Sequence, residues 1–244
     1  MELVSVLMPI YNEKAFVKEI VQRVLAVDLS NIGYEKEIVI VDDGSTDGTA
    51  QELTQIQKKN KNILLMQHEK NKGKGAAIRT AIMNAKGNII LIQDADLEYD
   101  PQEYKDLLLP FSKKEVNVVY GTRYIFNSAK QQTNMKLKYK KGYRLAYLGG
   151  RVLTTVTNVL YGANLSDEAT GYKVFRASVL KNISLKCTKF EFCPEVTAKV
   201  LKAGYKIVEV PISYNPRTYE EGKKINYKDG FEAIWTLIKY KFQN

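Results

Sequence analysis

Histidine and cysteine are nearly absent from this chain of 244 residues, which contains one histidine and two cysteines. The single histidine, His68, argues against a histidine-rich metal site and against a Ser-His-Asp triad. Cys187 and Cys193 have no second pair with which to complete a zinc site. We expect them to be buried or idle thiols in a protein of a reducing compartment.

Long apolar runs are absent as well. No stretch of about eighteen uncharged apolar residues occurs, so we expect no transmembrane helix, and we recognise no signal peptide at the start. The hydrophobic content of 45% and the charged content of 26% are ordinary for a soluble globular protein. The length suits one large domain, or one domain with an appendage.

Acidic residues are in deficit, because 37 Lys and Arg face 27 Asp and Glu, for a net charge of +10. This excess favours anionic partners, which include nucleic acid, nucleotides, phosphates and anionic membrane surfaces. Residues 127–166 contain no acidic residue at all. They combine Tyr139, Tyr143 and Tyr147 with the cations Lys130, Lys136, Lys138, Lys140, Lys141, Arg144 and Arg151. The segment is either a solvated basic loop or a contact surface for phosphates or an anionic membrane.

Short apolar runs alternate with helical patterns along the first half of the chain. We expect strands over residues 3–9, 37–41, 62–67, 89–93 and 116–120, with helices between them. The alternation is typical of βαβ units and predicts an α/β fold, with a mostly parallel sheet flanked by helices. Further along we expect helices over 143–161, 190–203 and 229–242, and a strand over 205–214.

Polar clusters follow four of these strands, at the point where each strand ends. They are Asn12-Glu13, Asp42-Asp43, Asp94-Ala95-Asp96 and Arg123. The carboxyl ends of parallel strands share one edge of a sheet, so clusters that are far apart in the sequence should converge there. An edge with this composition is suited to a nucleotide and its metal ion.

The segment 89–101 (IILIQDADLEYDP) joins a buried strand to two carboxylates one residue apart, Asp94 and Asp96. Hard cations such as Mg²⁺ and Mn²⁺ prefer oxygen ligands, and one or two carboxylates usually hold them together with substrate phosphates. A solvated turn or a helix cap is the alternative for an isolated D-x-D pair.

Three further features have two interpretations each. Gly73 and Gly75, beside Lys72 and Lys74, are either a phosphate cradle at a helix N-terminus or a plain turn with basic caps. Glu195 opens a helix, where it either interacts with the helix dipole or serves the chemistry. The amphipathic helix 229–242 either docks on its own domain or lies in a membrane interface.

These motifs together resemble one family. The runs PIYNE (9–13), VDDGSTDGT (41–49), NKGKG (71–75) and DAD (94–96) resemble the signatures of family 2 glycosyltransferases, in order and spacing. The segments 167–176 and 210–224 resemble the dolichyl- or polyprenyl-phosphate glycosyltransferases, of which the dolichyl-phosphate mannose synthases are the best-known branch. The resemblance implies a GT-A fold and covers almost the whole chain.

The resemblance also implies roles for individual residues. The nucleotide sugar would contact Pro9, Tyr11, Asn12, Glu13, Asp42, Asp43, Lys74, Asp94, Ala95 and Asp96. Mg²⁺ or Mn²⁺ would be held by Asp94, Asp96 and Glu98, the last at a position where the mannose synthases commonly have Gln. The acceptor phosphate would contact Arg123, Arg144, Arg217, Lys223 and Lys224. The catalytic set would be Asp94, Asp96, Arg123 and Asp167.

The resemblance further implies an organisation and partners. Residues 1–225 would form the catalytic domain and residues 226–244 the C-terminal helix. Many relatives carry C-terminal membrane helices, so this chain would be peripheral on the cytoplasmic face of a membrane, or would have a membrane-protein partner. Its substrates would be a nucleotide-diphosphate sugar and a polyprenyl or dolichyl phosphate, and nucleic acid is not expected.

The chemistry that this predicts is metal-dependent transfer of a hexose with inversion. A phosphate acceptor is largely dianionic at pH 7 and needs no strong base, whereas a saccharide or protein hydroxyl would need one, for which Asp167, Glu168 and Glu195 are candidates. GDP-mannose, UDP-glucose and UDP-N-acetylglucosamine remain open as donors. From other classes, a basic nucleic-acid-binding protein leaves the acidic edge unexplained, and a non-catalytic nucleotide-sugar binder leaves the intact acidic set unexplained.

Overall fold

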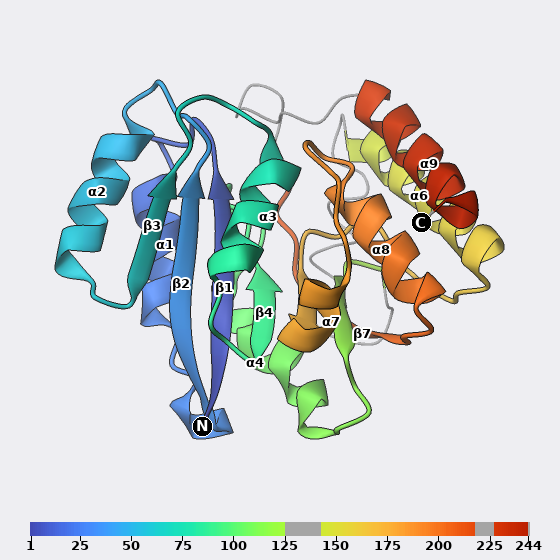
Figure 1. Cartoon of the computed structure of the whole chain (residues 1–244), viewed down its shortest axis with the longest axis horizontal. Coiled ribbons are helices and arrows are strands. Elements are labelled where there is room, and N and C mark those ends of the chain that lie inside the picture. The colour runs from blue at the N-terminus through green and yellow to red at the C-terminus, as the bar shows by residue number, and fades with distance from the viewer. Residues whose placement is uncertain (125–142, 218–226, 244) are drawn as a thin grey trace.

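The computed structural model describes residues 1–124, 143–217 and 227–243, and Figure 1 shows a sheet between layers of helices. The seven strands, in the order β3-β2-β1-β4-β6-β5-β7, form one sheet. The strands are β1 (Glu2–Ile10), β2 (Tyr34–Asp42), β3 (Ile63–Gln67), β4 (Ile89–Ile92), β5 (Val118–Thr122), β6 (Lys173–Arg176) and β7 (Ile207–Pro211). The main helices are α1 (Val17–Ala26), α2 (Thr49–Lys59), α3 (Lys74–Asn84), α4 (Tyr104–Leu108), α6 (Tyr143–Tyr161), α7 (Ala177–Asn182), α8 (Phe192–Lys202) and α9 (Tyr227–Phe242).

Six strands of the sheet share one direction and β6 opposes them. β1 pairs in parallel with β2 and β4, and β5 pairs in parallel with β7, while β6 is antiparallel to both β4 and β5. The edge that holds the carboxyl ends of β1, β2, β4, β5 and β7 therefore also holds the amino end of β6. The chain leaves β5 and enters β6 at this same edge.

Both faces of the sheet are buried, which explains the nearly continuous apolar runs in its central strands. Along β4, Ile89 and Leu91 belong to a core with helices α1, α2 and α4, whereas Ile90 and Ile92 belong to a second core with α3, α7 and α8. The period of two residues is that of any strand. A third, smaller cluster joins α6, α8 and α9 through Leu153, Ala198 and Leu237.

The expected α/β fold with a mostly parallel sheet and a C-terminal helix is confirmed. The strand β6 and the short helix α7 were not expected, because residues 167–176 were assigned to a polar segment. β6 is only four residues long, KVFR, and the sheet gains a reversed strand from it. The fifth strand runs from Val118 to Thr122 rather than over 116–120.

Candidate active site

The turn after β1 is tied to the turn after β2 by side chains of both. Asn12 has a φ of 49°, in the left-handed region that Asn tolerates better than most residues. Its backbone N–H donates to Ser45 Oγ at 2.9 Å, and its side-chain oxygen accepts from the N–H of Thr46 at 2.8 Å. Glu13 donates its N–H to Thr49 Oγ1 at 3.0 Å. The convergence predicted for these two clusters therefore has a hydrogen-bonded basis.

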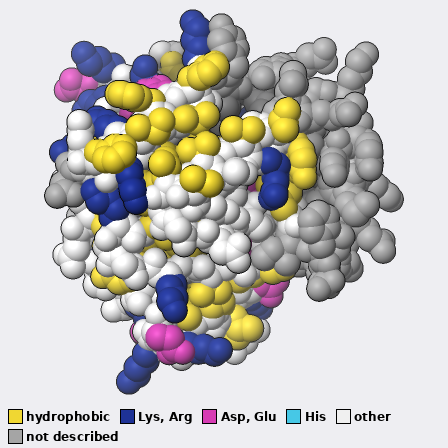
Figure 2. Space-filling model, turned by 90° about the vertical axis from the view of Figure 1, so that its right-hand side faces the viewer, with side chains coloured by type: hydrophobic (Ala, Val, Ile, Leu, Met, Phe, Trp, Pro, Cys, Tyr) yellow, Lys and Arg dark blue, Asp and Glu magenta, His cyan; other side chains and the backbone are white. Residues whose placement is uncertain are grey.

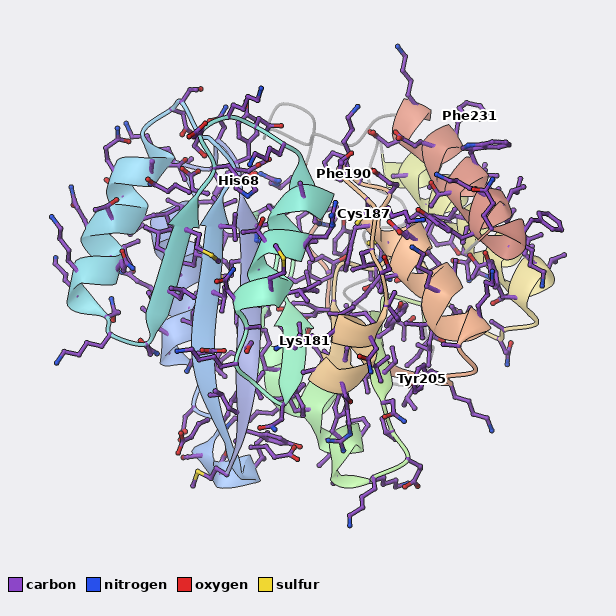
Figure 3. All side chains as sticks on the ribbon, viewed as in Figure 1. His68, Lys181, Cys187, Phe190, Tyr205 and Phe231 are labelled. Atoms are coloured by element: carbon purple, nitrogen blue, oxygen red, sulfur yellow. The ribbon has the colours of Figure 1, made fainter. Side chains whose placement is uncertain are left out.

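Asp43 organises the loops around it. Its carboxylate contacts His68 Nδ1 at 2.6 Å and accepts the backbone N–H groups of Lys72 and Gly73 at 3.0 and 2.7 Å. His68, labelled in Figure 3, lies between the end of β3 and α3, where its Nε2 contacts Thr80 Oγ1 at 3.0 Å. This pairing could not be predicted from the sequence, because 25 residues separate Asp43 from His68.

The turn before α3 uses its backbone on protein groups. Gly75 and Ala76 donate their N–H groups to the carbonyl oxygens of Lys189 and Thr188, at 2.9 and 3.0 Å. A Cβ on Gly73, whose φ is 94°, would lie 2.3 Å from the oxygen of Thr188, so this position requires glycine. Of the two interpretations, the described contacts favour the turn over a backbone phosphate cradle. The side chain of Lys74 remains directed at the acidic edge.

Asp94 and Asp96 each have a cationic partner. Lys74 Nζ lies 2.5 Å from Asp94 Oδ1, and Arg217 Nη2 lies 3.2 Å from Asp96 Oδ2. Burial disfavours the charge of Lys74, but the Asp94 carboxylate outweighs burial and raises the pKa of Lys74. Burial, followed by the neighbouring charges of Asp94 and Glu98, raises the pKa of Asp96 to about 7. The two carboxylates are therefore shielded from solvent and paired with cations, which differs from a solvated turn.

The backbone turns sharply after Asp96. Leu97 has a φ of 60°, which is rare for a residue with a side chain. The turn brings Glu98 beneath the segment that follows β7, where Glu98 accepts the hydroxyl of Tyr214 at 2.7 Å and the backbone N–H of Arg217 at 2.9 Å. Both carboxylate oxygens of Glu98 thus bind residues 214–217. A third metal ligand would instead need an oxygen that is not already engaged in this way.

Arg123 and Asp167 form a buried bidentate pair. Arg123 Nε lies 2.7 Å from Asp167 Oδ2 and Nη2 lies 2.7 Å from Oδ1, while the backbone N–H of Arg123 donates to Oδ2 at 3.0 Å. The guanidinium also lies over the ring of Tyr214, 4.8 Å from its centroid. Burial alone would lower the pKa of Arg123, but Asp167 holds it well above its usual value. The cation is therefore fixed in place and permanently charged.

The loop before β6 completes this edge. Glu209 of β7 accepts the N–H groups of Ser166 and Asp167, at 2.8 and 3.0 Å. Gly171 donates its N–H to the hydroxyl of Tyr99 at 2.9 Å. A Cβ on Gly171 would lie 2.8 Å from Asp94 Oδ2, so only glycine lets the loop approach the aspartate this closely. The reversal of β6 places this loop beside the carboxyl ends of the other strands.

The other candidate bases are occupied or enclosed. Glu195 accepts the N–H groups of Lys186 and Cys187, at 2.7 and 2.6 Å, and pairs with Lys199. It orders the loop before α8 and also lies in the first turn of that helix, where an acidic side chain interacts favourably with the helix dipole. Glu168 is fully buried, accepts the hydroxyl of Thr197 at 3.0 Å and has its pKa raised by burial.

The remaining predicted residues fall into three groups. Pro9 lies opposite Val41 in the ladder between β1 and β2, and Asp42 accepts the N–H of Ser45. Tyr11 is half-buried in the first turn, and Ala95 is buried in a core. Lys223, Lys224 and the side chain of Arg144 lie outside the described residues, as do the lysines of the basic segment. Both cysteines are free, and burial raises the pKa of each thiol.

The site contains four groups that the sequence did not reveal: His68, Tyr99, Glu209 and Tyr214. Their partners are far away along the chain; for example, 116 residues separate Tyr214 from Glu98. Tyr99 and Tyr214 pack against each other with their ring centroids 5.2 Å apart. Tyr99 and Tyr214 lie in two of the segments singled out above, 89–101 and 210–224, but nothing in those segments distinguished a tyrosine of the site from one of the core.

A divalent cation fits this site if it takes part of its ligand shell from groups outside the protein. Within the described ranges, no three His, Cys, Asp or Glu side chains are arranged to hold a metal by themselves. Asp94 and Asp96 supply the hard oxygen ligands that Mg²⁺ and Mn²⁺ prefer, and these ions commonly take the rest of their shell from phosphates and water. The guanidinium of Arg217 against Asp96 shows that a cation is already accommodated at this position.

Comparison with known proteins identifies relatives by sequence. The profile of Glycosyl transferase family 2 matches residues 5–184. A dodecaprenyl-phosphate galacturonate synthase of Rhizobium johnstonii is 27% identical over 98% of this chain and 66% of its own length. A UDP-N-acetylglucosamine–dolichyl-phosphate N-acetylglucosaminyltransferase of Methanococcus voltae is 29% identical over 98% of this chain and 96% of its own length.

Solved structures of the same fold include glucosyl-3-phosphoglycerate synthase of Mycobacterium tuberculosis. Its complex with Mn²⁺, uridine diphosphate and phosphoglyceric acid aligns with a TM-score of 0.72 and 18% identity, over 100% of this chain and 80% of that one. Its complex with Mg²⁺ and uridine diphosphate aligns with a TM-score of 0.68 and 17% identity, over 98% and 79%. These structures show that the chain has the GT-A fold.

Proposed function

Because the chain belongs to glycosyl transferase family 2 and is a glycosyltransferase, we propose that it moves a hexose from a nucleotide-diphosphate sugar to polyprenyl phosphate. The donor is of the GDP-mannose or UDP-glucose type, and the reaction needs Mg²⁺ or Mn²⁺. We assign residues 1–225 to the catalytic domain and residues 226–244 to a C-terminal appendage that contains helix α9 (Tyr227–Phe242). Two relatives named for transfer to polyprenyl phosphates align over nearly the whole chain, which supports this acceptor.

One observation carries the proposal: two carboxylates and three cationic side chains meet at one edge of the sheet. Asp94 and Asp96 pair with Lys74 and Arg217. Arg123 is linked to them through Tyr214, whose ring it covers and whose hydroxyl binds Glu98. A site of this composition suits two phosphate groups, one on each side of a transferred sugar.

Each part of the edge then has a chemical task. Asp94 and Asp96 would hold the divalent ion, which supplies Lewis-acid stabilisation to the leaving diphosphate. Lys74 adds positive charge where negative charge develops. Arg123 orients the acceptor phosphate, whose dianion attacks the anomeric carbon from the opposite face and inverts it.

The state of the carboxylates supports a phosphate acceptor over a hydroxyl. A hydroxyl acceptor would need a general base with a free oxygen that the acceptor can reach. Glu168 Oε2 has no hydrogen-bond partner among the described residues, but the Glu168 side chain is fully buried. Asp167 has both oxygens on Arg123, and Glu195 is held by backbone N–H groups and Lys199. Asp167 is therefore a positioning residue for Arg123, and a phosphate dianion needs no such base.

The outer side of α6 and α9 carries exposed apolar residues that suit contact with a membrane surface. The exposed residues Phe231, Trp235, Ile238 and Phe242 are spaced to line one side of α9. Leu148, Val152 and Val159 are exposed on α6, which packs against α9. Figure 2 shows hydrophobic side chains gathered on this side with Lys and Arg beside them, and Phe231 lies on the outer side of α9 in Figure 3.

The same helix docks on its own domain and presents this apolar side outward. Ala233, Leu237 and Tyr240 are buried against α6 and α8. None of the helices in the described part of the chain is both long and apolar enough to cross a bilayer. We propose that α6 and α9 lie against the cytoplasmic face of a membrane, where the lipid acceptor resides.

A transfer screen tests the reaction. Purified protein receives Mg²⁺ or Mn²⁺, a panel of UDP- and GDP-sugars and a short polyprenyl phosphate, with Asp96→Ala as the control. The expected result is a glycolipid whose formation needs the metal and Asp96. Metal-dependent donor binding with transfer only to sugars or peptides would reject the lipid acceptor, and absence of any nucleotide-sugar binding would reject the reaction altogether.

A further inference from the structure

The segment after β7 places a guanidinium inside the acidic edge. Arg217 Nη2 lies 3.2 Å from Asp96 Oδ2, Nη1 lies 3.1 Å from Glu13 Oε2, and Nε lies 3.8 Å from Glu98 Oε1. The side chain is 11% exposed. One cation therefore contacts three carboxylates that come from the ends of two strands, β1 and β4. The guanidinium is therefore enclosed by acidic side chains, unlike the cation of an exposed surface ion pair.

The backbone holds Arg217 in this position. Its N–H donates to Glu98 Oε1 at 2.9 Å, the hydroxyl of Tyr214 donates to Glu98 Oε2 at 2.7 Å, and the N–H of Asn215 donates to the carbonyl of Glu98 at 2.9 Å. Glu98 is thus bound to the segment from three directions. These three hydrogen bonds fix the backbone of the segment, and the backbone in turn places the guanidinium of Arg217 in the acidic edge.

Its side-chain hydrogen bonding is nevertheless incomplete. Arg217 Nε is buried and has no hydrogen-bond partner among the described residues, and the contact with Asp96 is at the long end of the range for an ion-paired hydrogen bond. Arg123 provides the contrast, with two bonds of 2.7 Å to a single carboxylate. The guanidinium of Arg217 thus contacts three carboxylates without a bidentate hydrogen-bonded pair to any of them. Its attraction to the site is mainly that of its charge, which another cation could replace.

We propose that Arg217 is an internal counter-ion of the metal site, which occupies Asp96 in the metal-free protein and must give it up when the divalent ion binds. The inference rests on the metal dependence of the proposed function. The three carboxylates lie close together and are largely shielded from solvent, where charges without partners are costly. Without metal, Arg217 supplies the positive charge that these carboxylates contact, and it makes the divalent ion compete for its own ligand. An ion that arrives with a diphosphate offers Arg217 replacement oxygens, so the competition is weakest when the donor is present.

The test measures metal binding in the absence of donor and lipid. Mn²⁺ is titrated into wild-type protein and Arg217→Ala at pH 8, and the free ion is followed by electron paramagnetic resonance. We expect Arg217→Ala to bind Mn²⁺ about tenfold more tightly, because one competing cation has been removed. Arg217→Lys, which retains a cation, should remain near the wild type. Arg23→Ala removes an exposed arginine of α1 with the same change of net charge, and it should leave the affinity unchanged.

Unchanged or weaker Mn²⁺ binding by a folded Arg217→Ala protein would overturn the proposal, since an arginine with only a structural role has no reason to oppose the metal. Circular dichroism establishes folding, and Arg217→Gln replaces Arg217→Ala if the latter does not fold. In the wild type, the NMR signal of the Arg217 side chain, assigned with Arg217→Lys, should shift on addition of Mg²⁺, and a static signal would also overturn it. Absence of sugar transfer would remove the proposed function and leave this titration unaffected, because it contains neither donor nor lipid.

Discussion

The two halves of the sheet contribute opposite charges to the same edge. Strands β1, β2 and β4, with their parallel order, supply the acids Glu13, Asp43, Asp94 and Asp96. The half built from β6, β5 and β7 supplies Arg123 and Arg217, together with the carboxylate that fixes Arg123. In the proposed reaction, the acidic half would hold the nucleotide and the metal ion, and the basic half would select the acceptor.

This division teaches that the two halves can be tested separately. A change in the acidic half should remove donor activation, and every acceptor should be affected alike. A change at Arg123 in the basic half should spare the donor and remove the use of the phosphate acceptor, whereas Arg217 contacts the acidic half directly. The predictions below run from the largest effect to the smallest.

Within the acidic half, we expect the largest loss of activity from a change at Asp96. We expect Asp96→Ala to lower transfer by a factor of about 10³ or more, because the metal that stabilises the leaving diphosphate loses a ligand. Asp100→Asn is the matched control, since Asp100 caps the next helical turn from a more exposed position. Initial rates of glycolipid formation measure the difference, and comparable losses in both variants would contradict the assignment.

Within the basic half, we expect the largest loss of activity from a change at Arg123. Arg123→Ala is expected to lower transfer to polyprenyl phosphate by about 10²–10³ while the affinity for the nucleotide sugar persists, because the residue binds the acceptor. Arg151→Ala is the control, since Arg151 also lies near Tyr124, at 5.8 Å from its ring centroid. Donor affinity from calorimetry is compared with the transfer rate, and equal loss of both would break the proposed division between the halves.

A third region, the outer side of α6 and α9, should affect only encounters with lipid. Replacing Phe231 and Trp235 by Ser removes two exposed apolar side chains, each of which contributes about 1.5–3 kcal/mol when buried. We expect vesicle binding to weaken at least tenfold, with little change in transfer to a short detergent-soluble prenyl phosphate. Flotation with anionic vesicles measures binding. Lys202→Ser, on α8, is the control, and an unaltered flotation profile would place the membrane contact elsewhere.

The smallest effect should be a change in stability with pH at the acidic half. Burial raises the pKa of Asp96 from 3.8 to about 7, so the folded protein binds this proton more tightly than the unfolded chain does. Its stability should therefore fall as the pH rises from about 4 to about 7, and the cost should be complete above 7. Asp96→Asn removes that cost, and we expect the metal-free variant to be more stable than the wild type by about 1–2 kcal/mol at pH 8.

Urea unfolding in the presence of a chelator measures this stability difference. The advantage of Asp96→Asn should shrink between pH 8 and pH 5, because the wild-type carboxyl then takes up its proton. A difference that is independent of pH, or of the opposite sign, would show that Asp96 is ionised throughout this range. Addition of Mn²⁺ should reverse the order of the two proteins at pH 8 if Asp96 is a ligand.

The acidic half could be predicted from the sequence because its information is local. A buried apolar strand followed directly by Asp94 and Asp96 predicts where both side chains lie, and the parallel order of the strands predicts that they meet Asn12 and Asp43. The sequence could not predict that Lys74 and Arg217 would bind the two aspartates. That pairing depends on helix α3 and on a segment 121 residues from Asp96.

The basic half was harder to predict because its elements are short and its contacts are long-range. β6 has four residues, and its reversed direction has no signature in the motif that surrounds it. Asp167 was singled out, but its role as the partner of Arg123 follows only from the order β6-β5-β7. The C-terminal amphipathic helix was predictable in kind, since residues 231, 235, 238 and 242 follow the helical period.

The route of the chain between β5 and β6 has a consequence for how such enzymes could diversify. The chain leaves the sheet at the end of β5 and enters it again at the start of β6, and both points lie at one edge because β6 runs against its neighbours. This excursion, which contains α6 and begins with Arg123, can be lengthened, shortened or exchanged without rethreading any strand. It is in effect a replaceable cassette, and grafting it from a relative with another acceptor would be the most economical way to retarget the same donor chemistry.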